Sequence, residues 1–261
     1  HKNYLASNPN LTTDQIDLLD SYHQVWDVRE LLAENSKLTD EQFMRFFNDS
    51  DVSKNNLAQN RNLTTEQIEL LYSTEGVTIE WLAAHSKLTD EQFMRFFNDE
   101  DCDKNYLAMN PYLTTEQIDL LYSTEGVRKH SLARYSKLTD EQFMRFFNDK
   151  KVYNSYLAQN PHLTTDQIDL LYSTEGVDKD YLASAPKLTD EQFNRLFNDS
   201  HVDKDSLAQN SHLTTEQIDL LYTRGDVNNR FLLTSSKLTD EQFMRFFNDS
   251  DADNNYLAFN P

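Results

Sequence analysis

Apolar residues recur along the chain at a fixed spacing. A Leu followed by Thr begins each repeat, at residues 11, 38, 63, 88, 113, 138, 163, 188, 213 and 238. With that Leu as position 1, Ile or Phe stands at position 6, Leu or Phe at position 9, and Tyr or Phe at position 10 in every repeat but the first. Positions 6, 9 and 10 lie on one face of an α-helix. The pattern therefore predicts one amphipathic helix in each repeat.

The start of this helix is specified by residues with known capping roles. Thr at position 2 and Gln at position 5 form the pattern of a capping box, and the apolar residues at positions 1 and 6 form that of a hydrophobic staple. An acidic residue at position 4, such as Glu66, falls in the first turn, where the helix dipole favours negative charge. We therefore expect a helix from the Thr of position 2 to about position 11.

A second, shorter helix is expected in the remainder of each repeat. Val is usual at position 15 and Leu stands at position 20 in the regularly spaced repeats, often with an aromatic residue directly before the Leu. This spacing fits one or two helical turns, short enough to be 3₁₀ in part. The repeat often closes with Asn-Pro or Asn-Ser, and Pro prevents the helix from continuing.

The repeat period sets the architecture. The first step is 27 residues and the others are 25, and periods of this size are typical of solenoids, whose repeats bury their apolar faces by stacking. Only 4 Gly and 5 Pro occur in 261 residues, which favours helices over strands. The sequence thus predicts an all-α fold, an α-solenoid of ten two-helix repeats forming a single domain over residues 1–261.

Repeats of two kinds alternate. Those that begin at residues 38, 88, 138, 188 and 238 carry Phe at position 6 and are called Phe repeats; the others carry Ile there and are called Ile repeats. Residues 37–49 return unchanged at 87–99, 137–149 and 237–249, so the pair of 50 residues is the expected unit of duplication. A two-residue insert lies within residues 20–26 and is expected in a loop. Both ends are uncapped half-repeats, from which we expect neighbouring repeats or domains in the full-length protein.

The joint between repeats carries a family resemblance. The pattern Val-x-x-x-x-Leu-Ala-x-Asn-Pro-x-Leu-Thr, seen from Val152 to Thr164 and, with Cys in the Val place, from Cys102 to Thr114, resembles that of the leucine-rich repeat variant family. HEAT-like helical repeats share similar patterns. The resemblance implies alternating α and 3₁₀ helices in a right-handed superhelix. It implies no iron–sulfur cluster here, because no Cys cluster accompanies the repeats.

The net charge of −20, from 44 acidic and 24 basic residues, limits the classes of partner. Direct binding to DNA or RNA needs a basic surface, so it is not expected. No apolar run approaches the roughly 20 residues of a membrane span, and no signal peptide is present, so a cytoplasmic location and no membrane contact are expected. The charge suits a basic protein partner.

Catalytic, cofactor and metal sites are not expected. Cys102, the only cysteine, occupies a place that Val fills in most repeats, so it is expected to be a buried apolar residue. Residues 98–103 carry alternating acids but lack the Gly of a calcium loop, and Asx capping of the short helix is the favoured role. The His residues show no zinc spacing. Carboxylate pairs recur identically, whereas catalytic pairs need distinct environments. The chain is therefore not expected to be an enzyme.

Candidate partner-facing residues are aromatic side chains in the variable part of the repeat. Half-buried packing is the favoured role of those directly before the Leu of position 20, and partner contact is the alternative. A row of Met at position 7 is expected to pack between repeats, or else to form an adaptable contact strip. Variation concentrates at positions 13–19 and 22–25, where specificity is expected. The candidates are Trp26, Trp81, Tyr106, Tyr156, Tyr181 and Phe231.

Three functions remain open from the sequence. The first is a non-enzymatic protein-binding or scaffold module with an extended, acidic, repetitive surface, whose identical sites suit a multivalent partner. The second is a mimic of nucleic acid that inhibits a basic protein, in which case the source is expected to be a phage or similar. The third is a structural spacer in a larger assembly.

Overall fold

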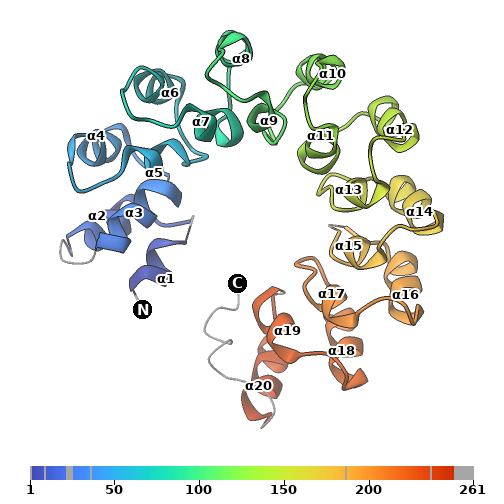
Figure 1. The fold of residues 1–261 in the computed structure, drawn as a ribbon. Helices are drawn as coiled ribbons and strands as arrows, with labels where there is room; N and C mark the ends of the chain where they lie inside the picture. Colours follow the sequence, from blue (N-terminus) through green and yellow to red (C-terminus); the bar gives the residue numbers. More distant parts are fainter. Residues whose placement is uncertain are drawn as a thin grey trace. The chain divides into compact units, whose positions relative to one another are not determined.

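The computed structural model describes residues 2–8, 10–21, 26–35, 37–185, 187–235 and 237–249. Contacts divide the chain into two compact units, residues 1–139 and 140–261. In each unit the first helices of the repeats, which are the longer ones in all repeats but the first, form one row, and the second helices form another beside it (Figure 1). We call these the long-helix row and the short-helix row. All regular structure in the described ranges is helical and follows the period of about 25 residues, as a helical-repeat solenoid requires.

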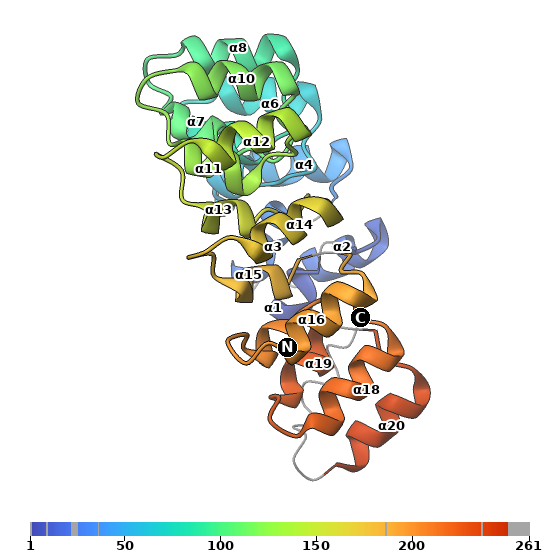
Figure 2. The ribbon, with the colours of Figure 1, turned by 90° about the vertical axis from the view of Figure 1, so that its right-hand side faces the viewer.

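The long helices begin where the capping pattern predicts. Thr64, for example, lies before α6 as its N-cap, with its side-chain oxygen accepting from the backbone N–H of Gln67 at 3.3 Å, while Gln67 Oε1 accepts from the N–H of Thr64 at 3.1 Å. The long helices are α2 (Thr13–Asp20), α4 (Asp40–Asn48), α6 (Thr65–Tyr72), α8 (Asp90–Asn98), α10 (Thr115–Ser123), α12 (Asp140–Asn148), α14 (Thr165–Ser173), α16 (Asp190–Asn198), α18 (Thr215–Arg224) and α20 (Asp240–Asn248). Figure 2 shows α16, α18 and α20 following one another along the row of the second unit.

The second helices are α-helical and short, as predicted, except α3, which has 10 residues against 8 in α2. Their ends carry the tighter 3₁₀-type hydrogen bonds, such as that from Asn56 N–H to Ser53 O at 3.0 Å. They are α1 (Lys2–Ala6), α3 (Trp26–Asn35), α5 (Lys54–Ala58), α7 (Ile79–His85), α9 (Lys104–Leu107), α11 (Lys129–Tyr135), α13 (Asn154–Ala158), α15 (Lys179–Ala183), α17 (Lys204–Ala208) and α19 (Asn229–Ser235). The two-residue insert of the first repeat was predicted within residues 20–26, and residues 22–25 of this segment lie outside the described residues.

The core consists of the periodic apolar residues. Phe93 and Phe96 of α8, Ile118 and Leu121 of α10, and Leu107 of α9 are each at most 1% exposed. Burial of an aromatic or branched aliphatic side chain contributes roughly 1.5–3 kcal/mol. Each repeat therefore obtains its stability by stacking these residues against its neighbours. None of the described helices is long and apolar enough to span a membrane.

Polar contacts link an Ile repeat to the Phe repeat that follows it. The Nε2 of Gln92, the same residue that closes a capping box, donates to Thr65 O at 3.2 Å and to Glu69 Oε1 at 2.8 Å. Arg95 pairs with Glu69 at 2.6 Å, and its guanidinium lies over the Tyr72 ring, 4.2 Å from the centroid. These bonds join α6 to α8, so the helix cap and the packing between repeats share one Gln.

Buried Asn residues at position 23 of the Phe repeats provide a second link. Asn110 is 2% exposed, and its Nδ2 donates to Ala83 O, in the last turn of α7 (Ile79–His85), at 2.7 Å and to the O of Ser86, the C-cap of α7, at 2.9 Å. Its Oδ1 accepts from Tyr112 N–H at 2.9 Å. In the second unit, Asn210 makes the equivalent bond to Ala183 O and a second bond to Ala185 O. These side chains fix the joints that carry the variable residues.

Candidate binding site on the short-helix row

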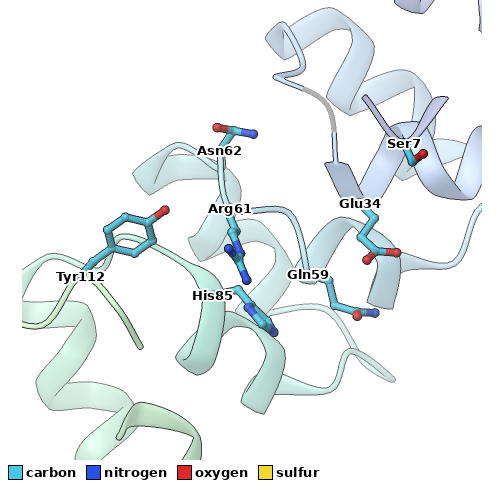
Figure 3. A pocket seen from close by; sticks show the side chains of 7 residues that line it. All are labelled: Ser7, Glu34, Gln59, Arg61, Asn62, His85 and Tyr112. Carbon is cyan, nitrogen blue, oxygen red and sulfur yellow. The ribbon is translucent and has the colours of Figure 1, made fainter. Parts of the chain in front are cut away.

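A pocket of about 430 Å³ opens at the joints of the first unit (Figure 3). Its lining comes entirely from repeat positions 22–25, which directly follow the Leu-Ala or equivalent pair that ends the short-helix core. These are among the positions at which the sequence predicts specificity. The residues are Ser7, Glu34, Gln59, Arg61, Asn62, His85 and Tyr112.

The short helices and the buried Asn residues position this lining. Glu34 lies in α3, Gln59 is the C-cap of α5 and His85 is the last residue of α7. Asn60 donates to Ala33 O at 2.7 Å and accepts from Asn62 N–H at 2.8 Å, so it ties the joint below the pocket to the preceding repeat. A repeated residue thus supports the residues that vary.

Arg61 and His85 are the distinctive side chains of the pocket. Arg61 stands where the other repeats have Ser or Pro, and it points toward His85 (Figure 3). Burial lowers the pKa of His85, and the positive charge of Arg61 lowers it further. The imidazole is therefore neutral near pH 7, because its ordinary pKa of about 6.5 already lies below that pH.

The pocket supplies groups suited to recognition. The Arg61 guanidinium presents hydrogen-bond donors in a fixed fork, and Glu34 places a carboxylate on another part of the lining. The Tyr112 side chain is 44% exposed and adds an aromatic surface with a hydroxyl. Such a mixture of charged, polar and aromatic groups is suited to binding a polar segment of another molecule.

The aromatic residues predicted to face a partner lie along the short-helix row. Trp81 in α7 stacks on His85 with ring centroids 5.8 Å apart, and it contacts Tyr106 edge-on at 6.4 Å. Trp81 thereby contacts both the pocket residue His85 and the neighbouring aromatic candidate Tyr106. Trp81 and Tyr106 are both of intermediate exposure, in agreement with the half-buried packing that was favoured from the sequence.

The remaining aromatic candidates are distributed over both units. Tyr156, Tyr181 and Phe231 lie in α13, α15 and α19 of the second unit, and Tyr181 is the most exposed of them at 39%. Trp26 begins α3, and its side chain lies outside the described residues. The structure thus brings Trp81 and Tyr106 together in one unit and places the other three in the second.

Arg61, His85, Glu34 and Tyr112 were not predicted as one set from the sequence. Their joints are separated by one or more repeats along the chain, so only the stacking brings them around one pocket. The available signal was the departure of Arg61 from the Ser or Pro found at its place elsewhere. Joint residues that break the repeat are therefore informative markers of a site.

The acidic residues of 98–103 act as helix-capping and linking groups. Asp99 Oδ2 accepts from the Tyr72 hydroxyl at 2.6 Å, and its Oδ1 accepts from Asp101 N–H at 2.9 Å. These two bonds, in that order, lower the pKa of Asp99. Asp103 caps α9 by accepting from Asn105 N–H at 2.9 Å. The predicted Asx capping is confirmed, and in the described part of the chain no three His, Cys, Asp or Glu side chains are grouped to hold a metal ion.

Cys102 and the row of Met residues have contrasting environments. Cys102 is 3% exposed, as predicted, and burial raises the pKa of its thiol to about 12. The favoured prediction for the Met side chains was packing between repeats. It is wrong for a large part of their surface, which is exposed to solvent. Met44, Met94, Met144 and Met244 are 40%, 41%, 42% and 51% exposed. They lie one position past the buried Phe of position 6, which turns them partly outward.

Comparison with known families finds a short match inside the long helices. The model of the FMRFamide-related peptide family matches residues 38–46, 88–96, 138–146 and 238–246. Each matched segment contains Phe-Met-Arg-Phe, which in α4 comprises the buried Phe43 and Phe46 and an Arg45 paired with Asp17. The match covers four stretches of nine residues, and Phe46 continues into Phe47 within a helix. It therefore shows a repeated motif with a structural role.

Comparisons with curated proteins and with solved structures each found no match to this chain.

Proposed function

We propose that the chain is a non-enzymatic protein-binding scaffold module that presents an extended, acidic, repetitive surface. The observation that carries the proposal is the separation of two sets of residues. Periodic residues such as Phe93 and Gln92 are buried or joined to the preceding repeat, whereas the pocket is lined entirely by the variable joint positions. Repeat proteins of this type bind partners over extended surfaces formed by successive repeats.

The pocket and Trp81 form the proposed seat of the partner. Trp, Tyr and Arg are the residues that most often dominate the energy of protein interfaces, and Trp81, Tyr112 and Arg61 lie at or beside this pocket. The net charge of −20 favours rapid association with a basic partner. A partner that places one polar side chain in the pocket and an apolar surface on Trp81 meets both parts of the site.

Quantitative affinity capture tests this function. The immobilised wild-type protein and its Arg61→Ser variant are exposed to lysate of the source organism at low and moderate salt, and the captured proteins are quantified by mass spectrometry. Ser occupies the place of Arg61 in several other repeats, so the variant is expected to fold. We expect a defined protein to be retained by the wild type and depleted with the variant.

A control variant separates the pocket from the general charge of the surface. Arg128→Ser removes one positive charge at the N-cap of α11, away from the residues that line the pocket. We expect it to retain the partner. Capture of nothing at either salt concentration contradicts the binding function and favours the structural spacer, and equal capture by all three proteins contradicts the role of the pocket.

The distribution of acidic residues bears on nucleic-acid mimicry. Exposed acids lie at the N-terminal ends of the long helices, such as Asp90 and Glu91, and also beyond their C-terminal ends, such as Glu100 and Glu125. A mimic of the duplex backbone needs its acids on one continuous stripe, since duplex DNA carries a charge about every 1.7 Å of helix axis. This arrangement counts against mimicry and in favour of the scaffold.

The finer classification within helical repeats is part of this proposal. The joint pattern supports kinship with the leucine-rich repeat variant family and its right-handed superhelix, with HEAT-like repeats as the alternative. The short second helices and their 3₁₀-type end bonds suit the former. The cytoplasmic location stays a prediction.

A further inference from the structure

The two kinds of interface between long helices differ at one pair of positions. Where a Phe repeat follows an Ile repeat, position 7 of the first and position 8 of the second hold an ion pair, as in Glu69 with Arg95. Where an Ile repeat follows a Phe repeat, the same two positions hold Met44 and Leu70, or Met94 and Leu120. An apolar pair thus replaces the salt bridge at every second interface of the first unit.

This replacement leaves a groove open to solvent. At the Ile-to-Phe interface, Arg95 reaches back across the helices and covers the Tyr72 ring. Leu is shorter and has no charged end to reach an acid on the preceding helix. The groove between α4 and α6 has a volume of about 270 Å³, with Met44 40% and Leu70 36% exposed in its wall. The buried Phe43 also contributes to its lining.

The same groove recurs 50 residues later. Between α8 and α10, a groove of about 270 Å³ is lined by Asp90, Phe93, Met94, Thr114, Glu116, Gln117 and Leu120. Each of these residues occupies the repeat position of its counterpart in the first groove, which is lined by Asp40, Phe43, Met44, Thr64, Glu66, Gln67 and Leu70. The recurrence follows from the alternation of repeats and does not depend on one local irregularity.

The charge of the lining identifies the occupant. Each groove combines an apolar wall with two carboxylates, Asp40 and Glu66 in the first and Asp90 and Glu116 in the second, and no basic side chain lines either groove. Asp40 accepts one hydrogen bond from Gln67 at 3.0 Å, while Glu66 is exposed at the helix end. An apolar side chain flanked by Lys or Arg satisfies both features. A second copy of this chain is disfavoured by its net charge of −20.

We propose that the paired grooves beside Met44 and Met94 bind a partner segment in which Leu, Met or Phe alternates with Lys or Arg, with one apolar side chain entering each groove. Met suits such a site because its flexible side chain adapts to different apolar groups. The grooves lie on the long-helix row, so this surface is separate from the pocket around Arg61. Packed helices lie about 10 Å apart, which places the two grooves, two helices apart, roughly 20 Å from each other.

A fluorescent peptide tests the chemistry of the grooves. The probe is a ten-residue peptide of Lys and Leu, and the matched control carries Glu in place of every Lys. Binding to the intact chain is measured by fluorescence anisotropy at low salt and at about 0.5 M NaCl, where the Debye length falls to about 4 Å. We expect the Lys peptide to bind and to weaken with salt, and the Glu peptide not to bind.

Variants locate the bound peptide. Asn194 stands at the place of the Met in the fourth Phe repeat, so Asn is compatible with the helix there. Met44→Asn together with Met94→Asn is expected to weaken binding about tenfold, because the apolar wall is lost. Met109→Asn is the matched control, because Met109 is 37% exposed and follows α9 on the short-helix row. This variant is expected to bind as the wild type does.

A tethered probe tests the pairing of the grooves. Two Lys-Leu segments joined by about 12 Gly and Ser residues span roughly 20 Å, which matches the estimated separation. We expect the tethered probe to bind at least about tenfold more tightly than one segment, because the second contact is intramolecular, and to lose this gain with Met94→Asn alone.

Several outcomes overturn the proposal. They are equal binding of the Lys and Glu peptides, unchanged binding by the Met44→Asn and Met94→Asn double variant, equal weakening by Met109→Asn, and concentration-dependent dimerisation that the double variant abolishes. The last result identifies a second copy as the occupant. Because Arg61→Ser leaves the grooves intact, it is expected to bind the peptide normally, so failure of this proposal and failure of the pocket function are distinguishable.

Discussion

Substitution of Asn110 by Ala measures how strongly the joints hold neighbouring repeats together. The buried Asn110 side chain makes three hydrogen bonds, to Ala83 O, Ser86 O and Tyr112 N–H, at 2.7, 2.9 and 2.9 Å. A hydrogen bond contributes about 1 kcal/mol net, and a buried group left without its partner adds to the loss. We therefore expect the free energy of unfolding of the region around α7 and α9 to fall by about 3–5 kcal/mol.

Native-state hydrogen exchange with mass spectrometry resolves this loss by region. Repeat arrays open locally, so a single denaturation midpoint averages over repeats of different stability. Amides of α7 and α9 are expected to exchange faster in Asn110→Ala, whereas those of α17 are expected to be unchanged. The control is Asn198→Ala, whose side chain is exposed and bonds only within its own helix, to Asn194 O at 2.7 Å. A loss below about 1 kcal/mol for Asn110→Ala, or equal losses for both variants, refutes the reasoning.

Three further predictions concern the core, an ion pair and the cysteine. Phe96→Leu is expected to lower the free energy of unfolding in urea by about 1–2 kcal/mol, because Leu196 fills the same place in another repeat. Phe96→Ala is expected to lower it by about 3–5 kcal/mol, because it leaves a cavity in the core, and equal losses for the two variants contradict this. The hydrogen bond from the Lys179 ammonium is the main reason that the pKa of Asp199 lies well below its usual range. The ionised carboxylate therefore stabilises the folded state above about pH 4, the ordinary pKa of Asp. Asp199→Asn is therefore expected to lower the urea midpoint at pH 7, with the difference from wild type shrinking as the pH falls toward 2, and a difference that grows on acidification contradicts it. Cys102 is expected to resist alkylation by iodoacetamide at pH 8 until urea unfolds the chain, since its pKa is raised to about 12; rapid labelling of the native protein, seen by intact mass, contradicts its burial.

The helix starts and the helical repeat fold follow from local chemistry in the sequence. Thr64 and Gln67 specify a capping box within four residues, and the structure forms it as predicted. The hydrogen bonds between repeats are harder to predict from the sequence, because they depend on which way a side chain points once its helix has formed. The side-chain oxygen of Gln92 accepts a hydrogen bond in the cap of its own helix, and its nitrogen donates to the preceding helix. The first role was predicted from the sequence, and the second is seen only in the structure.

The candidate site was predictable in position but not in composition. Positions 22–25 were expected to carry specificity, and they line the pocket of the first unit. Glu34 and Tyr112 line the same pocket only because of how much each repeat turns relative to the last, which no local pattern encodes. Exposure of Met44 was missed for a related reason: apolar character predicts burial, but the Leu70 that replaces an Arg leaves it uncovered.

Repeated residues are predicted to hold the fold, and variable joint residues are predicted to select the partner. The most direct test measures stability and partner affinity in parallel for Arg61→Ser, in the pocket, and Asn210→Ala, at a buried joint of the second unit, using the captured partner and calorimetric titration. We predict that Arg61→Ser lowers affinity at least about tenfold, which is about 1.4 kcal/mol, with unchanged hydrogen exchange. We predict that Asn210→Ala speeds exchange around α15 and α17, because Asn210 bonds to Ala183 O and Ala185 O, while its folded fraction binds with an affinity near that of the wild type, because Asn210 does not line the pocket. Unchanged affinity in Arg61→Ser, or equal losses of stability in the two variants, would contradict the claim.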